Sequence, residues 1–255
     1  MNKKAGAFAI GMVLAMIVLM SLTLYSISKS NQDVEKTFSL KNLTSLYLEA
    51  DRISFYFKEA SRLSAHQAFY EIVKDAAINT SNKLCFSQSY EDKEIIIWDK
   101  NCKPEINFLK ERFLLEYKKN IAKYAKRYPK DVKFEIESWM ENDKVVSRLK
   151  VKLNERNERY NISYSFVKVF YTNLTSESIV LEDFPEIYEK VNVKKENKEN
   201  IENCFGLSFE RWKCKAKRID DSYLFELETK NPYFFELDGK EHFENIRLVF
   251  LLKQG

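Results

Sequence analysis

A long apolar stretch opens the chain and lies between lysines. No Asp, Glu, Lys or Arg occurs between Lys4 and Lys29, and residues 8–24 are almost wholly apolar. A helix rises about 1.5 Å per residue, so about 20 apolar residues cross the roughly 30 Å hydrocarbon core of a bilayer. The pattern predicts a transmembrane helix over residues 5–28, with membrane lipid as its surroundings.

The charges that flank this stretch predict its orientation. Lys3 and Lys4 precede it, whereas residues 29–36 carry charges of both signs. The positive-inside tendency then favours a single-pass protein of the cell membrane, with a cytoplasmic N-terminus and an extracytoplasmic body. A cleavable secretory signal is the alternative, with Ser26-Ile27-Ser28 as the small-x-small sequence. Both interpretations export the body.

A second helical pattern follows over residues 29–83. Apolar residues recur there at steps of three and four as far as Ile78, and no Gly or Pro interrupts the chain between Gly11 and Pro104. The pattern predicts a long amphipathic helix. Its apolar face either packs against the rest of the same chain or against neighbouring copies.

Residues 84–255 are expected to form an α+β domain, with a subdivision near residues 175–200. A helix is predicted over 104–127, followed by a meander of antiparallel strands between residues 131 and 171 with a turn at 154–157. Further strands are predicted at 94–98, 211–219, 222–229 and 243–253, and a short helix around 200–209. Residues 179–192 show no clear pattern. The expected fold is therefore a transmembrane helix that continues into a long helix, with a second helix and an antiparallel β-sheet.

Four cysteines lie in this domain, and an even number in an exported body indicates disulfides. Pairing of Cys85 with Cys102 and of Cys204 with Cys214 closes two short loops, although four cysteines allow three connectivities. A zinc site is the alternative, but the chain has no Cys-x-x-Cys and only two histidines. Four sequons fit a glycosylated extracytoplasmic surface: Asn42, Asn79, Asn161 and Asn173.

The sequence offers no arrangement of catalytic residues. His66 and His242 have no nucleophile or carboxylate at a motif spacing, and no phosphate-binding or dinucleotide glycine motif occurs. We therefore predict no enzyme activity, no cofactor and no metal, and leave a hydrolase open only if a pocket exists. A net charge of +4 over 255 residues does not favour nucleic-acid binding. The basic end of the helix at 104–127 is expected to be solvated, with a patch for anionic polymers as the alternative.

The opening Lys3-Lys4-Ala5-Gly6-Ala7-Phe8, followed by an apolar helix, resembles the start of type IV pilin-like proteins, and Lys-Lys-x-Gly is similar to archaeal class III leaders. The resemblance implies a leader over residues 1–6, cleaved by prepilin peptidase between Gly6 and Ala7. It also implies an N-terminal helix that packs in a filament core. The fifth mature position would be Gly11, where the family usually has an acidic residue.

Taken together, these patterns predict a membrane-anchored structural protein. The chain would be a minor pilin-like subunit of a surface filament or a secretion-type pseudopilus, and its partners would be other pilin-like subunits bound through the N-terminal helix. The alternative is a tethered extracytoplasmic module that binds a ligand or acts in adhesion without joining a filament.

Overall fold

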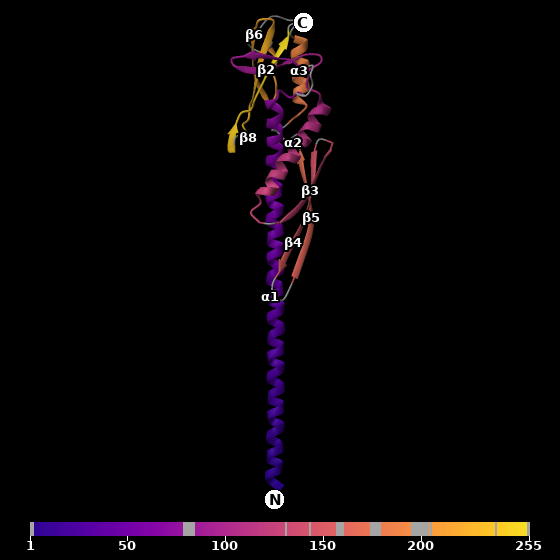
Figure 1. Cartoon of the computed structure of the whole chain (residues 1–255), viewed down its shortest axis with the longest axis vertical. Coiled ribbons are helices and arrows are strands. Elements are labelled where there is room, and N and C mark those ends of the chain that lie inside the picture. The colour runs from indigo at the N-terminus through magenta and orange to yellow at the C-terminus, as the bar shows by residue number, and fades with distance from the viewer. Residues whose placement is uncertain are drawn as a thin grey trace. The chain divides into compact units, whose positions relative to one another are not determined.

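The computed structural model describes residues 3–78, 85–130, 132–142, 144–156, 161–173, 180–194, 204, 206–237 and 239–253. Over these residues the chain is α+β, with three helices and ten strands (Figure 1). The helices are α1 (Lys3–Lys74), α2 (Ile106–Arg127) and α3 (Asp183–Lys194). The strands are β1 (Ser87–Tyr90), β2 (Lys93–Trp98), β3 (Lys133–Glu141), β4 (Lys144–Arg156), β5 (Asn161–Asn173), β6 (Trp212–Ile219), β7 (Ser222–Thr229), β8 (Tyr233–Leu237), β9 (Lys240–Glu244) and β10 (Arg247–Lys253).

The predicted transmembrane helix is wrong. Among the described residues, no helix is long and apolar enough to cross a membrane. The prediction rested on the apolar residues 8–24 and on the lack of charges between Lys4 and Lys29. The expected continuation into a long helix is confirmed, because α1 is a single helix of 72 residues that runs through the polar positions after Ile27 to Lys74.

The chain divides into two compact units. The first contains Met1–Ile53 and Leu153–Tyr164, and the second contains Ser54–Lys152 and Ser165–Gly255. In the first unit, the rings of Tyr47 and Tyr164 meet edge to face with centroids 4.9 Å apart. Leu46, Ala50 and Ile53 are buried, whereas the large apolar side chains between Val18 and Ile27 are 57–68% exposed.

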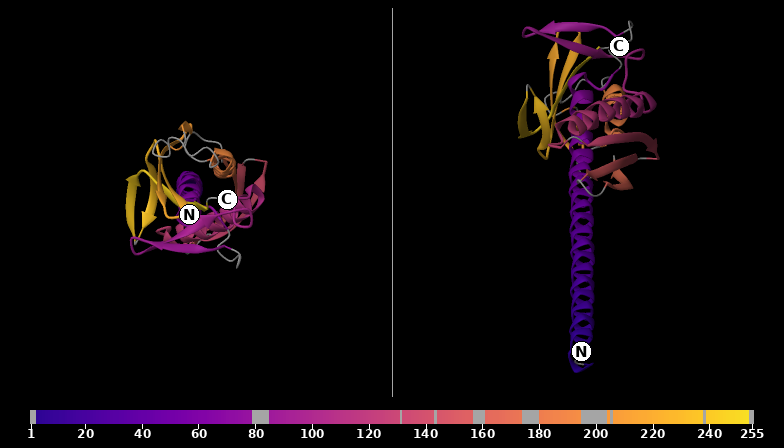
Figure 2. Two further views of the ribbon diagram at one scale, coloured as in Figure 1. Left: turned by 90° about the horizontal axis from the view of Figure 1, so that it is seen from above. Right: turned by 60° about the horizontal axis from the view of Figure 1, so that its bottom comes forward.

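The second unit is built around residues 54–74 of α1. Figure 2 shows this part of the helix with α2 on one side and the β8–β9 hairpin on the other. Phe57 is fully buried and meets Phe134 of β3 edge to face, and Tyr70 stacks on Phe235 of β8 at 4.0 Å. The apolar face of the predicted amphipathic helix is thus covered, from Ser54 onward, by residues of its own unit.

The described strands form three sheets. The five-stranded sheet has the order β1-β2-β10-β7-β6, the three-stranded sheet has the order β3-β4-β5, and β8 pairs with β9. The antiparallel sheet predicted from sequence needs a correction, because β10 runs parallel to β2 with Leu251 opposite Ile97. A parallel pair joins strands that are distant in sequence, so alternation within one strand does not reveal it.

Three further boundaries differ from the prediction. β4 continues to Arg156, so residues 154–156 extend a strand and the expected turn does not begin at 154. Residues 243–253 are split between β9 and β10, and residues 183–194 form α3. Residues 200–203 and 205 of the expected short helix at 200–209 lie outside the described residues. Within the described part, Cys204 and Gly206 are in 3₁₀ conformation and residues 207–209 are in no helix.

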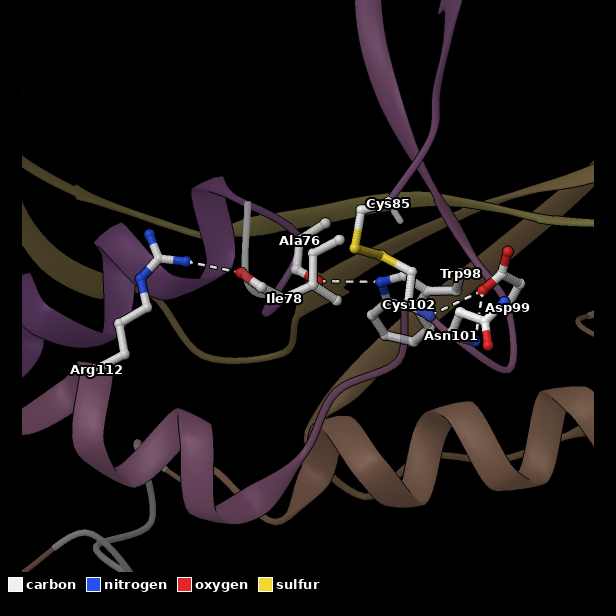
Figure 3. The surroundings of a disulfide bond; sticks show 8 residues. All are labelled: Ala76, Ile78, Cys85, Trp98, Asp99, Asn101, Cys102 and Arg112. Carbon is white, nitrogen blue, oxygen red and sulfur yellow. Dashed lines mark hydrogen bonds between the residues drawn. A yellow bond between two sulfur atoms is a disulfide. The ribbon is translucent and has the colours of Figure 1, made fainter. Parts of the chain in front are cut away.

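The Cys85–Cys102 disulfide joins the two ends of the β1–β2 hairpin beside the end of α1 (Figure 3). Cys85 bonds Cys102, and the indole nitrogen of the fully buried Trp98 donates to the Ala76 carbonyl at 3.0 Å. The carboxylate of Asp99 accepts from the backbone N–H groups of Asn101 and Cys102 at 2.7 and 2.8 Å. These contacts fix the loop after β2 on the C-terminal end of the helix.

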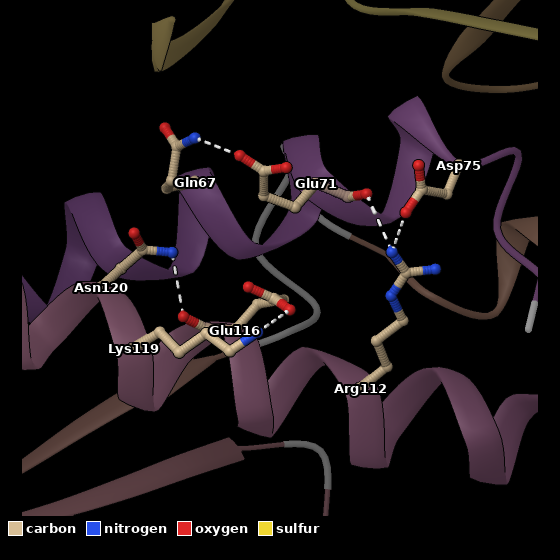
Figure 4. A network of polar contacts seen from close by, with 7 residues as sticks. All are labelled: Gln67, Glu71, Asp75, Arg112, Glu116, Lys119 and Asn120. Atoms are coloured by element: carbon tan, nitrogen blue, oxygen red, sulfur yellow. Dashed lines mark hydrogen bonds and ion pairs between the residues drawn. The ribbon is translucent and has the colours of Figure 1, made fainter. Parts of the chain in front are cut away.

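A polar layer between α1 and α2 sets how the two helices pack (Figure 4). The guanidinium of Arg112 pairs with Asp75 and donates to the Ile78 carbonyl at 3.0 Å, so it satisfies backbone acceptors at the end of α1. Gln67 donates to Glu71 at 2.9 Å and also reaches the Glu236 carbonyl of β8 at 3.1 Å. Side chains of α1 therefore contact α2 on one side and the β8–β9 hairpin on the other.

Candidate functional site

The largest cavity described in the second unit is an open groove of about 1000 Å³. Successive turns of α1 form its floor, the end of β5 forms one wall and the β8–β9 hairpin forms the other. The residues that line it are Ser54, Phe55, Lys58, Glu59, Ser61, Arg62, Ala65 and His66 of α1, residues 168–172 of β5, and Pro232, Phe234 and Phe243 of the hairpin segment.

Buried hydroxyl groups hold the floor and the β5 wall together. Ser61 Oγ lies 2.6 Å from Tyr117 Oη of α2 and 2.6 Å from Thr172 Oγ1 of β5. Tyr117 Oη lies 2.8 Å from Ser147 Oγ, which lies 2.9 Å from Ser138 Oγ. Burial raises the pKa of Tyr117, so this phenol stays neutral and bonds as a hydroxyl. The cluster is a structural network because none of its members is ionised near pH 7.

His66 borders the groove as a neutral imidazole. Burial lowers its pKa to about 4, and the positive charge of Arg62 acts in the same direction. Its ring meets that of Tyr233 edge to face with centroids 5.9 Å apart, and its Nδ1 has no hydrogen-bond partner among the described residues. The imidazole is therefore uncharged at neutral pH.

The rim of the groove carries an excess of positive charge. Lys58, Arg62 and Lys168 contribute three cations and Glu59 contributes the only carboxylate among the lining residues. Glu59 accepts from Arg62 at 3.0 Å on an exposed part of the helix. The groove is thus suited to a partner that brings carboxylates.

The walls also present large apolar side chains to solvent. Phe55, Tyr171 and Phe243 are 70%, 66% and 72% exposed, although each lines the groove. Exposed aromatic groups around a polar rim are typical of surfaces that bind another macromolecule. The groove thus combines exposed aromatic side chains with a cationic rim.

The structure confirms the predicted pairing of Cys85 with Cys102 and of Cys204 with Cys214, so the zinc alternative fails because the four sulfur atoms are bonded to each other. His242 lies on β9, opposite Phe235 of β8, and the two rings stack with centroids 5.3 Å apart. Within the described part of the chain, no cluster of three or more metal-ligating side chains occurs.

The remaining predicted site residues lie at positions whose side chains the structure does not describe. Asn79 is outside the described residues, and Asn42, Asn161 and Asn173 lie in α1 and β5 with side chains that are not described. Gly6 and Ala7 belong to α1, again without described side chains. Cleavage and glycosylation at these positions stay predictions.

The groove was not predicted from the sequence. Its lining comes from three segments separated by more than 50 residues each, so no local spacing brings them together. One signal was available: Val167, Val169 and Tyr171 are apolar at alternate positions of β5 on the face opposite Phe170, which is buried.

No family model, no curated protein and no solved structure matches the chain.

Proposed function

We propose that this chain is a structural subunit that assembles with further copies through the N-terminal part of α1. One observation supports the proposal most directly: the apolar side chains from Val18 to Ile27 stay 57–68% exposed on a continuous helix. An uncovered apolar helix of this length gains free energy when another apolar helix covers it.

The resemblance to type IV pilin-like proteins supports the same function, since packing of N-terminal helices is how such subunits join. Cleavage between Gly6 and Ala7 belongs to this proposal. The two disulfides support a body exposed outside the cytoplasm, where disulfides persist.

The proposal is tested by sedimentation velocity of the full chain purified under non-denaturing conditions. We expect the wild-type chain to sediment as assemblies, and the Leu22→Asp variant to sediment as a monomer because a carboxylate would be buried between apolar helices. Leu22→Met keeps the side-chain volume and apolar character, so it should assemble like the wild type. Equal sedimentation of Leu22→Asp and Leu22→Met would contradict the proposal.

The groove supports a second candidate function, a module that binds a ligand or acts in adhesion. Its aromatic walls and cationic rim are suited to recognition. They lie in the second unit, whereas residues 18–27 belong to the first. In that case Leu22→Asp and Leu22→Met would sediment alike, and both would keep binding at the groove.

A further inference from the structure

The edge of β5 faces the groove. β5 is the last strand of the sheet β3-β4-β5, and among the described strands it pairs with β4 alone. Five consecutive β5 residues, 168–172, line the cavity. Side chains alternate between the two faces of a strand, so a cavity lined by consecutive residues runs along the strand's edge. Backbone N–H and C=O groups at such an edge are a template for a further strand.

The surroundings of this edge select the kind of strand that fits. Tyr171 and Phe243 offer exposed aromatic surface, whereas Lys58 and Lys168 offer cations that have no ion pair with any described residue. The added strand should therefore carry both apolar side chains and carboxylates.

The opposite edge of the same sheet has these properties. β3 pairs with β4 alone among the described strands, and Glu135, Glu137 and Glu141 alternate along it. Glu135 and Glu137 lie 3.6–3.9 Å from Arg148 and Lys150 in exposed ion pairs, which are weak. Trp139 of β3 is 37% exposed, which supplies the aromatic group.

β3 also borders a cavity of its own. About 560 Å³ lies between β3 and α2, and four β3 residues line it: Phe134, Ile136, Glu137 and Ser138. Both edges of the sheet are thus accessible, one with acidic residues along the strand and the other with a cationic rim.

We propose that the β5 edge and its groove bind the β3 strand of a second copy of this chain. The two three-stranded sheets then join edge to edge through backbone hydrogen bonds, with Trp139 of one copy against the aromatic wall of the next. Each copy uses a different edge for each neighbour, so the contact is heterologous and repeats into an open row of subunits. This interface is separate from the α1 contact, and either can fail without the other.

The test uses a fluorescein-labelled synthetic peptide with the sequence of Lys133–Glu141, titrated with the full chain and followed by fluorescence anisotropy. We expect saturable binding that weakens as salt is added, because part of the attraction is electrostatic. A peptide with Glu135→Lys, Glu137→Lys and Glu141→Lys should bind at least tenfold more weakly. Absence of binding by the native peptide overturns the proposal.

A pair of charge reversals locates the site on the full chain. Lys58→Glu with Lys168→Glu changes two exposed residues of the groove and should weaken the native peptide at least tenfold. Lys213→Glu with Lys215→Glu makes the same charge change on β6, an edge strand of the other sheet, and should leave binding unchanged. Equal binding by the two double variants overturns the assigned site.

Backbone methylation separates strand pairing from side-chain docking. One peptide is N-methylated at positions 134, 136 and 138, and another at 135, 137 and 139, so each loses the N–H donors of one edge only. Pairing through a single edge requires that one methylated peptide loses binding and the other keeps it. Retention of binding by both peptides, or loss by both, overturns strand addition.

Discussion

Ser61 shows how one small side chain connects distant parts of the sequence. Its hydroxyl touches Tyr117 of α2 and Thr172 of β5, which are 56 and 111 residues away. The residue lies on the apolar face of α1, where a hydroxyl is buried at a cost unless it is hydrogen-bonded. The network with Ser147 and Ser138 meets that requirement and fixes the β5 wall of the groove on the helix.

His66 makes the stability of the chain depend on pH. Its pKa is about 4 in the folded chain and about 6.5 when unfolded, so the unfolded state binds more protons between these values. The stabilisation is therefore complete above pH 6.5 and is lost as the pH falls toward 4. We expect the free energy of unfolding in urea to fall by up to about 3 kcal/mol over this window on account of His66.

The His66→Gln variant isolates this effect. Gln does not titrate, so the free energy of unfolding should depend less on pH between 4 and 6.5 than in the wild type. His242→Gln, at the other histidine of the chain, is the matched control and should keep the wild-type dependence. If His66→Gln and the wild type lose the same free energy over this window, His66 is not the group responsible.

Among the elements, those with strong periodicity were predicted closely. The pattern over 104–127 became α2 at Ile106–Arg127, and the pattern over 222–229 matches β7 at Ser222–Thr229. In α2 the buried positions recur at the helical period, whereas β7 is buried along most of its length, as expected for a short apolar run bounded by turn residues.

Two elements were missed although the sequence held a signal for each. α3 begins with Asp183 and has Pro185 in its first turn, and both residue types favour the start of a helix. The Asp238-Gly239 pair before Lys240 is typical of a hairpin turn, and Gly239 has a φ of +75°. By contrast, no local signal predicts the parallel β2–β10 pair or the groove, because both depend on tertiary contacts between distant segments.

The two disulfides act on elements of the second unit and should contribute unequally. Loop-closure entropy grows with loop length, and the separations are 17 residues for Cys85–Cys102 and 10 for Cys204–Cys214. We expect the Cys85→Ala/Cys102→Ala variant to lose about 3 kcal/mol of unfolding free energy in urea. The Cys204→Ala/Cys214→Ala variant should lose about 0.5 kcal/mol less. A larger loss in the second variant would show that native contacts, rather than loop closure, set the order.

At the scale of the whole molecule, each proposed contact between copies has its own surface of the chain. The exposed apolar residues of α1 belong to the first unit, whereas β3 and the β5 residues 168–172 that line the groove belong to the second. An apolar helix contact gives little directional specificity, whereas strand pairing fixes register through backbone hydrogen bonds. The two contacts together would give an assembly both stability and order.

Photo-cross-linking tests whether α1 of one copy contacts α1 of another. A benzophenone amino acid replaces Leu22 in the full chain, and the cross-linked product is mapped by mass spectrometry; the same group at the exposed Ser89 of β1 is the control. We expect irradiation to join the Leu22 position to α1 residues of a second copy, with no such product from Ser89. Absence of any copy-to-copy product from Leu22, or products that map only to other elements, would mean that the α1 helices of two copies do not pack at this position.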